Sequence, residues 1–247
     1  MEIDQFSRTR LLFGEEALAK FAVTRVAVMG LGGVGSYVAE ALARSGIFKM
    51  LLVDFDKISL SNINRQLPAL HSTLGRHKTE VLRERLLDIN PLMEVDVFNG
   101  FCNEDSRSEL LINVDFVIDA IDSLAPKVGL LEECYNTQMP VISVMGAASR
   151  FDPSMIELTD FSKTSVCPLA RRVRKYLRRR GINKGIPAIY SREVPIDQFP
   201  PEAGTIQDWE GKTGRMRGTL GSVAYMPAIM GLWAASYVLN RLKDEEL

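Results

Sequence analysis

The chain has 247 residues, of which 46% are apolar and 25% are charged, and its formal net charge is −1. This composition is ordinary for a soluble globular enzyme, and the length allows one large domain. The three cysteines, Cys102, Cys134 and Cys167, form no Cys-x-x-Cys pair. Their number and spacing argue against a disulfide framework and a structural zinc site, and they favour a cytoplasmic location. No secretory signal is expected, because the first residues contain no apolar run.

Short apolar runs alternate with helical patterns over the first part of the chain. Strands are expected at residues 25–30, 49–56, 93–100, 115–122 and 139–146, and helices at 35–46, 77–89, 104–112 and 124–138. Short buried strands that alternate with amphipathic helices are typical of a mainly parallel sheet. We therefore expect an α/β fold that is Rossmann-like and doubly wound, with helices on both faces of the sheet.

The pattern changes after residue 146. A strand is expected at 155–160, then a helix that begins with Pro168 and ends at Arg180 before Gly181, and another strand at 188–194. Residues 218–240 contain no charge, but small and polar residues interrupt this stretch. It is therefore interpreted as a buried core or dimer-interface helix, and membrane association is not expected. These elements predict a C-terminal α/β extension of a single domain, 1–247.

A glycine-rich turn follows the first predicted strand. Gly30, Gly32 and Gly35, with Gly33 between them, fit the pattern Gly-x-Gly-x-x-Gly between a strand and a helix. Such a turn brings bare backbone N–H groups and a helix N-terminus against an anionic phosphate. Asp54 follows at the distance where an acid binds a ribose hydroxyl. These features predict a nucleotide site, but they fit NAD and ATP equally well.

The residues after Asp54 favour ATP. They add a second acid and a set of amide and basic side chains: Asp56, Asn62, Asn64, Arg65, Gln66 and Lys78. A nucleotidyl-transfer site needs such groups because charge develops on the α-phosphate and on the departing pyrophosphate. Asp122, at the end of the fourth predicted strand, is placed to hold Mg²⁺. The cofactors predicted are therefore ATP and Mg²⁺.

These motifs together resemble the ubiquitin-activating-enzyme-like (ThiF/MoeB/HesA) superfamily of adenylyltransferases. The resemblance rests on residues 30–35, 54–56, 61–66, 78 and 119–123. It implies that Asp54 binds the ribose, that Asn62 and Arg65 bind the phosphates, that Lys78 neutralises them and that Asp122 holds magnesium. It also implies a homodimer in which an N-terminal arginine reaches the γ-phosphate of the partner's site. Arg8 and Arg10 are both candidates for this catalytic role.

The last third of the chain resembles the tRNA threonylcarbamoyladenosine dehydratases. The matching segments are residues 152–164, 168–178, 190–193 and 221–232, although Cys167 stands where an aspartate often precedes Pro-Leu-Ala. The resemblance implies ATP-dependent dehydration of N6-threonylcarbamoyladenosine at position 37 of tRNA, through adenylylation of its carboxylate. The resemblance also implies that residues 1–150 form the ATP-binding core and that residues 151–247 form the extension that binds tRNA and mediates dimerisation. A cysteine desulfurase or sulfur-acceptor relay is a further candidate partner.

One predicted helix is strongly basic. Residues 171–184 hold eight basic side chains and no acidic one. Like charges at this spacing destabilise a helix, and an RNA backbone would relieve the repulsion. The predicted tRNA-binding residues, with no role in DNA binding, are Arg171, Arg172, Arg174, Lys175, Arg178, Arg179 and Arg180.

Simpler interpretations compete with some of these roles. Lys78 alone could be a solvated surface lysine, and Asp119 is expected to end its strand and cap the next helix. Cys167 lies at a helix N-terminus, which can lower the pKa of a thiol, but nothing marks it as activated. The alternative function is an adenylyltransferase for the C-terminus of a ubiquitin-like or sulfur-carrier protein. A non-catalytic nucleotide or RNA binder and an NAD-dependent oxidoreductase rank below it.

Overall fold

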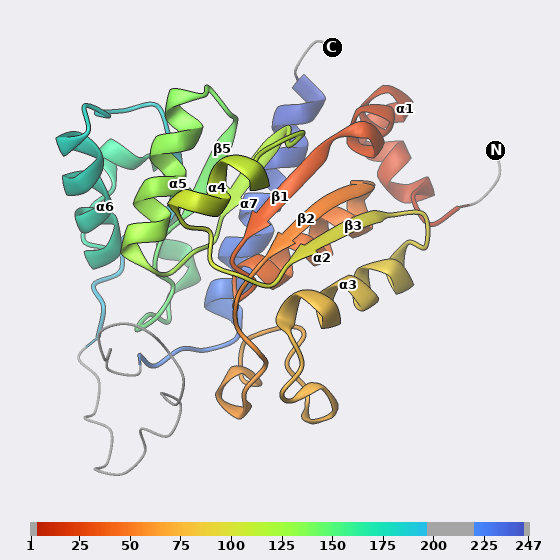
Figure 1. Ribbon diagram of the computed structural model, residues 1–247, viewed down its shortest axis with the longest axis horizontal. Helices are drawn as coiled ribbons and strands as arrows, with labels where there is room; N and C mark the ends of the chain where they lie inside the picture. The colour runs from red at the N-terminus through yellow and green to blue at the C-terminus, as the bar shows by residue number, and fades with distance from the viewer. Residues whose placement is uncertain (1–3, 197–219, 245–247) are drawn as a thin grey trace.

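The computed structural model describes residues 4–196 and 220–244, and they form one seven-stranded sheet with helices on both faces (Figure 1). Neighbouring strands are parallel, except that β6 runs antiparallel to β7. In spatial order the strands are β3 (Glu94–Phe98), β2 (Lys49–Val53), β1 (Arg25–Met29), β4 (Phe116–Asp119), β5 (Val141–Val144), β7 (Pro187–Ser191) and β6 (Ile156–Asp160). This confirms the predicted α/β class and its mainly parallel, doubly wound sheet.

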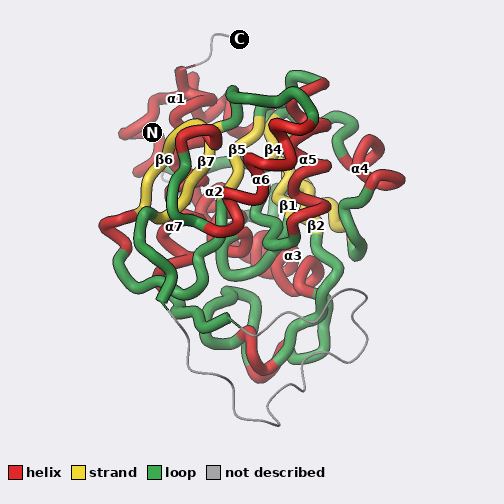
Figure 2. Tube along the Cα trace, turned by 90° about the vertical axis from the view of Figure 1, so that its left-hand side faces the viewer, coloured by secondary structure: helices red, strands yellow, loops and turns green. Residues whose placement is uncertain are grey.

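The helices divide between the two faces, as predicted. One face is covered by α1 (Ser7–Val23), α2 (Gly35–Ser45), α3 (Lys78–Ile89) and α7 (Tyr225–Asp244). The other face is covered by α4 (Glu104–Leu110), α5 (Leu124–Asn136) and α6 (Pro168–Arg179). Figure 2 shows α5 and α6 lying beside each other. The chain thus crosses the sheet several times, as a doubly wound topology requires.

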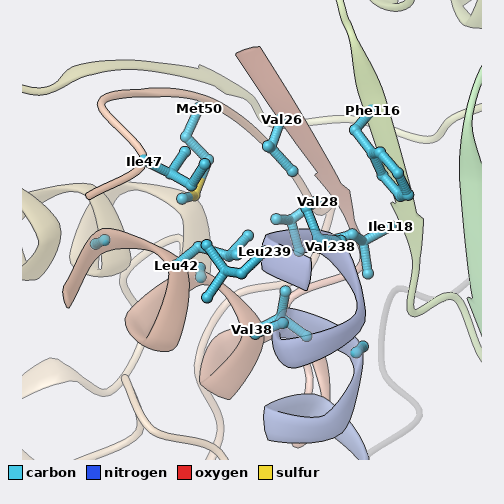
Figure 3. Close-up of a cluster of buried hydrophobic side chains, with 14 of the residues drawn as sticks. Val26, Val28, Val38, Leu42, Ile47, Met50, Phe116, Ile118, Val238 and Leu239 are labelled. Carbon is cyan, nitrogen blue, oxygen red and sulfur yellow. The ribbon is translucent and has the colours of Figure 1, made fainter. Parts of the chain in front are cut away.

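Two hydrophobic cores lie on the two faces because side chains of a strand alternate in direction. Val26 and Val28 of β1 pack on one face, with Leu42 of α2 and Val238 and Leu239 of α7 (Figure 3). Ala27 and Met29 of β1 pack on the opposite face with α5 and α6. Full burial of such side chains stabilises a fold by roughly 1.5–3 kcal/mol each, as an upper range.

The uncharged C-terminal stretch forms α7, a core helix as the sequence predicts. It packs so closely on α2 that a Cβ at Gly231 would lie 2.5 Å from the carbonyl oxygen of Val34. Among the helices of the described residues, none is both long and apolar enough to span a membrane. Because α7 packs against α2, it also braces the segment where α2 begins.

The sequence did not predict α1, and the structure explains why. This helix is broken by a non-helical backbone at Gly14 (φ 85°, ψ 168°), and it buries only Ala17, Lys20 and Phe21. Leu11 and Leu12 are instead exposed. Two short helical pieces with an exposed apolar pair do not produce the periodic apolar stripe by which a helix is recognised.

Candidate nucleotide-binding and catalytic site

The glycine-rich turn joins β1 to α2, and most of its glycines are required by the protein's own packing. Gly30 has a left-handed backbone (φ +92°), and a Cβ there would lie 2.9 Å from the carbonyl oxygen of Ala120. A Cβ at Gly35 would collide with the carbonyl oxygen of Gly30, and one at Gly33 would lie 3.1 Å from Pro227. The turn is therefore wedged between the segment after β4 and the start of α7.

Gly32 differs from the other three glycines. A Cβ at this position would meet nothing closer than the Nε2 atom of Gln66, at 3.9 Å, which is ordinary van der Waals contact. Its backbone is not left-handed either, since its φ lies outside the positive range. The fold itself therefore does not require a glycine at position 32. In a Gly-x-Gly-x-x-Gly turn, the second glycine lets a phosphate approach the backbone.

Asp54 follows β2 and forms a hydrogen bond with the glycine-rich turn. It is buried, and its Oδ2 accepts a hydrogen bond from the backbone N–H of Leu31 at 2.7 Å. Its Oδ1 accepts another from the N–H of Asp56 at 2.8 Å. Burial raises the pKa of the Asp54 carboxyl, and the ammonium of Lys78 together with the two amides opposes that rise. A carboxylate oxygen accepts more than one bond, so Asp54 retains capacity for a ribose hydroxyl.

Lys78 is the first residue of α3, and it is buried rather than solvated. Its Nζ lies 3.0 Å from Oδ2 of Asp56 and 3.8 Å from Oδ1 of Asp54. The structure thus brings Lys78 next to two aspartates that lie more than 20 positions before it in the sequence. This buried ammonium lies at the carboxyl edge of a parallel sheet. An incoming phosphate can compete with the two carboxylates for it.

The segment from residue 59 to 66 lies along the same edge. A 3₁₀ turn, Leu60–Asn62, is held by Oδ1 of Asn62, which accepts a hydrogen bond from the N–H of Ser59 at 3.2 Å. Arg65 donates to the carbonyl oxygen of Ser61 at 2.8 Å. The carbonyl oxygen of Arg65 would lie 3.3 Å from a Cβ at Gly33, so the segment borders the glycine-rich turn.

Two amides of this segment extend the site in different directions. Gln66 is buried and points towards Gly32, and within the described part of the chain its Oε1 has no hydrogen-bond partner. Asn64 donates through Nδ2 to the carbonyl oxygen of Ser222 at 3.0 Å. The segment therefore bridges the glycine-rich turn and the residues that lead into α7.

Asp122 lies beyond β4 rather than at its end, since the strand stops at Asp119. The strand was predicted to extend to residue 122, because Ala120 and Ile121 continue the apolar run beyond the end of β4. The Asp122 side chain is exposed and accepts a hydrogen bond from the hydroxyl of Ser123 at 3.2 Å. In residues 4–196 and 220–244, no three His, Cys, Asp or Glu side chains gather where they could hold a metal ion.

Asp119 ends β4 as expected, but it does not cap α5. Its carboxylate is fully buried and forms an ion pair of 2.7 Å with Nζ of Lys127 on α5. The hydroxyl of Ser143 donates to the same carboxylate at 2.6 Å. Lys127 was not predicted from the sequence. The only signal was a lysine at helical spacing from the apolar residues Leu130, Leu131 and Cys134.

Known proteins resemble this whole arrangement. The model of the ThiF family matches residues 6–246. The chain belongs to the ThiF family. One relative in this family, "tRNA threonylcarbamoyladenosine dehydratase" of Bacillus subtilis, is 40% identical over 99% of this chain and 97% of its own length. The protein of that name from Haemophilus influenzae is 43% identical over 94% of this chain and 90% of its own length.

A solved structure shares the fold of this ThiF-family chain. It is the Escherichia coli tRNA N6-threonylcarbamoyladenosine dehydratase in complex with ATP, with a TM-score of 0.84 and 34% identity. The match covers 96% of this chain and 93% of the other. The similarity therefore includes β6, α6, β7 and α7 as well as the glycine-rich turn and the residues around it.

The N-terminal arginines of this ThiF-family chain lie away from the nucleotide site. Phe6 packs against Phe48, which precedes β2, so α1 begins at the amino edge of the sheet. Arg10 is held by ion pairs of 2.8 Å with Asp4 and with Glu15. Arg8 is exposed. The sequence left the two residues equivalent, whereas the structure distinguishes them.

The basic helix forms as predicted, but its residues are not equivalent. Arg174 donates to the backbone and hydroxyl oxygens of Thr164, and Arg180 forms an ion pair of 2.9 Å with Glu132. Tyr176 is exposed, with the Arg179 guanidinium 5.6 Å from its ring centroid. The remaining basic residues of α6 are exposed: Arg171, Arg172, Lys175 and Arg178.

All three cysteines of this ThiF-family chain are buried. Burial raises the pKa of the Cys102 thiol to about 11 and that of the Cys134 thiol to about 12. Cys167 precedes α6 as expected, and its sulfur would lie 3.9 Å from a Cβ at Gly146. A thiol enclosed in this way has no access to a substrate in this conformation.

Proposed function

We propose that the chain is a cytoplasmic enzyme, an ATP-dependent tRNA threonylcarbamoyladenosine dehydratase. The observation that carries the proposal is the cluster of Asp54, Asp56 and Lys78, which Asp54 joins to a glycine-rich turn whose Gly32 has no protein atom crowding the position of a Cβ. This cluster occurs in a chain that resembles proteins of that name along its whole length. The cluster supports ATP as one substrate, and the full-length resemblance supports the modified tRNA as the second substrate.

ATP fits the site through contacts of several kinds. The turn at Gly32 and the N-terminus of α2 suit the phosphates, because backbone N–H groups and the helix dipole favour negative charge there. Asp54 would accept from the ribose, and Asn62, Arg65 and Lys78 would bind the phosphates. The amide Nε2 of Gln66 faces Gly32 and would donate to a phosphate there.

Mg²⁺ fits the site through Asp122. Magnesium is commonly bound through one or two carboxylates together with substrate phosphates, rather than by a cage of protein ligands. Asp122 is one exposed carboxylate beside the glycine-rich turn and suits that mode. The ion would there neutralise charge on the phosphates of ATP, as Lys78 and Arg65 do from the protein side.

The chemistry needs no protein nucleophile. A carboxylate oxygen of the threonine moiety attacks the α-phosphorus of ATP, and pyrophosphate leaves. The resulting mixed anhydride has AMP as its leaving group, whereas the free carboxylate would have to expel oxide. A nitrogen or oxygen of the neighbouring urea then attacks the activated carbonyl carbon and AMP departs, so the nucleoside loses one water in total. Proximity of the two groups accelerates this ring closure, which agrees with the burial of all three cysteines.

The second substrate is assigned to the C-terminal part of the chain. Arg174 and Arg180 are already paired within the chain. The exposed basic residues of α6 would bind phosphates of tRNA without recognising its base sequence. In this division, residues 1–150 carry the ATP-binding core and 151–247 bind tRNA and take part in dimerisation.

A homodimer is also proposed. Leu11 and Leu12 of α1 are 81% and 78% exposed, and Leu232 and Trp233 of the neighbouring α7 are also exposed. Exposed apolar side chains on two helices that contact each other suit an interface with a second copy. Because Asp4 and Glu15 hold Arg10, we assign the arginine that acts on the partner's ATP to Arg8. A sulfur-relay protein could bind the assembly, but no buried cysteine of this chain could receive sulfur without a rearrangement.

The test of the proposal is tRNA-dependent cleavage of ATP. Purified protein, Mg-ATP and tRNA that carries the threonylcarbamoyl group should release AMP and pyrophosphate in equal amounts. The same tRNA without this group should release none. Release of pyrophosphate with a small carrier protein that ends in Gly-Gly, and none with the modified tRNA, would instead establish the carrier-activating function.

A further inference from the structure

Lys127 is a fully buried ammonium group that the proposed reaction does not use. It reaches from α5 to the ends of β4 and β5, where its Nζ lies 2.7 Å from the Asp119 carboxylate. It also donates to the carbonyl oxygen of Val144 at 2.8 Å and to that of Ile121 at 3.0 Å. A further carbonyl, that of Asp119 itself, lies at 3.5 Å. The side chain thus satisfies its donors entirely at the carboxyl edge of the sheet.

Stability alone does not account for this pair. Taking two charges out of water costs several kcal/mol per ion, and apolar residues of similar volume often replace buried ion pairs without loss of stability. Retention of such a pair is therefore better explained by the geometry that it imposes. The neighbouring apolar residues of α5, Leu130 and Leu131, show that this face of the helix could be purely hydrophobic.

This geometry involves the backbone N–H and the backbone carbonyl group of Ile121. Its N–H donates to Oδ1 of Asp119 at 3.1 Å, and its carbonyl oxygen accepts from Lys127 at 3.0 Å. The ion pair therefore holds this residue from both sides. Asp122 is the next residue in the chain, so its backbone direction is set by the orientation of the Ile121 carbonyl.

The other end of the same turn is fixed against the glycine-rich turn. The N–H of Ala120 donates to the carbonyl oxygen of Met29 at 2.9 Å, and the carbonyl oxygen of Ala120 lies only 2.9 Å from the position that a Cβ of Gly30 would take. Residues 120–122 are thus attached to the phosphate-binding turn on one side and to Lys127 on the other. Displacement of the Ile121 carbonyl would move Asp122 relative to the nucleotide.

We propose that Lys127 is a positioning residue: with Asp119 it fixes the turn 120–122 so that Asp122 meets Mg-ATP in the orientation needed for adenylylation. The inference rests on the proposed function, because it assigns a cause to the placement of Asp122 in that same site. It predicts that loss of Lys127 and loss of Asp122 act on one step, and that the effects of the two changes are not additive.

The experiment compares Lys127→Met with the double variant Asp119→Asn/Lys127→Met. The single change leaves a buried carboxylate without its cation and should lower the melting temperature. The double change removes both charges, and the amide oxygen introduced at position 119 can still accept from the N–H of Ile121, so most of the melting temperature should return. Nevertheless, the rate of AMP formation should stay about 10-fold or more below wild type, since a small misplacement of a catalytic group is costly. The Mg²⁺ concentration for half-maximal rate should rise several-fold.

A third change tests the coupling. Addition of Asp122→Ala to the double variant should reduce the rate much less than Asp122→Ala does in the wild-type chain. Wild-type rate and Mg²⁺ requirement in the double variant, or a full additive loss on adding Asp122→Ala, would overturn the positioning role. If the double variant does not fold, Lys127→Arg decides, since it keeps the positive charge beside Asp119 but replaces the single Nζ that contacts the Ile121 carbonyl by a larger, planar group. An unchanged Mg²⁺ requirement in that variant would contradict the proposal. Failure of the wild-type protein to form AMP would instead contradict the proposed function.

Discussion

Lys78 and Asp56 form an ion pair of 3.0 Å at the carboxyl edge of the sheet, although 22 positions separate them in the chain. The lysine is buried at the start of α3, while the aspartate is partly exposed in the loop after β2. An ammonium group that has given up most of its hydration for one carboxylate is ready to exchange that partner for a phosphate. This relationship excludes the solvated-surface interpretation of Lys78 and supports its proposed role in the nucleotide site.

Replacement of Lys78 by Ala should therefore abolish most turnover. In the proposed mechanism its charge would stabilise the transition state in a site partly shielded from water, where one such contact contributes about 2–4 kcal/mol to lowering the activation free energy. We expect the rate of AMP formation to fall by at least ~100-fold. Lys163→Ala, at an exposed lysine far from the turn, serves as the control and should retain the wild-type rate. A Lys78→Ala variant with wild-type turnover would remove this residue from the mechanism.

The two glycines Gly30 and Gly32 should respond differently to alanine. Gly30→Ala strains a left-handed backbone and pushes against Ala120, so the melting temperature should fall. Gly32→Ala meets no protein atom within 3.4 Å, so the melting temperature should not change. If the phosphates of ATP approach Gly32, however, the Gly32→Ala protein should bind ATP more weakly. Its dissociation constant for ATP, measured by calorimetry, should rise about 10-fold, which is a loss of ~1.4 kcal/mol of binding free energy. Unaltered ATP affinity in a folded Gly32→Ala protein would place the nucleotide elsewhere.

The choice of Arg8 over Arg10 can be tested by mixing inactive subunits. Arg8→Ala should lose activity, and a mixture of Arg8→Ala with Asp122→Ala subunits should regain part of it, because one of the two sites in the mixed dimer is complete. Arg10→Ala should chiefly lower the melting temperature, through loss of its ion pairs with Asp4 and Glu15. Sedimentation should show dimers throughout. Recovery in mixtures that contain Arg10→Ala but not Arg8→Ala would reverse the assignment.

The role of α6 predicts a salt-dependent effect on tRNA alone. Neutralisation of its exposed residues should raise the KM for tRNA and reduce the salt dependence of tRNA affinity by up to ~0.9 per lost phosphate contact. The affinity for ATP should stay nearly unchanged. The substitutions are Arg171→Gln, Arg172→Gln, Lys175→Gln and Arg178→Gln.

A matched control has the same number of exposed positive charges removed elsewhere, on α2, α3, α7 and the loop after β2. Its substitutions are Arg44→Gln, Lys57→Gln, Arg83→Gln and Lys243→Gln. Equal tRNA affinity of the two quadruple variants across a salt series would show that α6 has no special part in RNA binding.

The alternation of apolar runs predicted the sheet and most helices, because burial on both faces leaves a direct pattern in a parallel strand. The residue types after Asp54, together with the resemblance, assigned Lys78 and residues 61–66 to the nucleotide site. The pattern carried no information about pairing between distant side chains. The ion pair of Lys127 with Asp119 was therefore missed, as were the partners that distinguish Arg10 from Arg8. The broken helix α1 was missed because Gly14 interrupts its periodicity.

The central claim is that this chain removes one water from a modified adenosine in tRNA with ATP as the activating group. The most direct measurement is mass spectrometry of nucleosides from tRNA incubated with the protein, Mg²⁺ and ATP. The account predicts that the mass of N6-threonylcarbamoyladenosine decreases by one water, and that an ATP analogue whose α–β phosphate link cannot be cleaved gives no change. An unchanged nucleoside in the presence of ATP, or loss of water without any nucleotide, would contradict it.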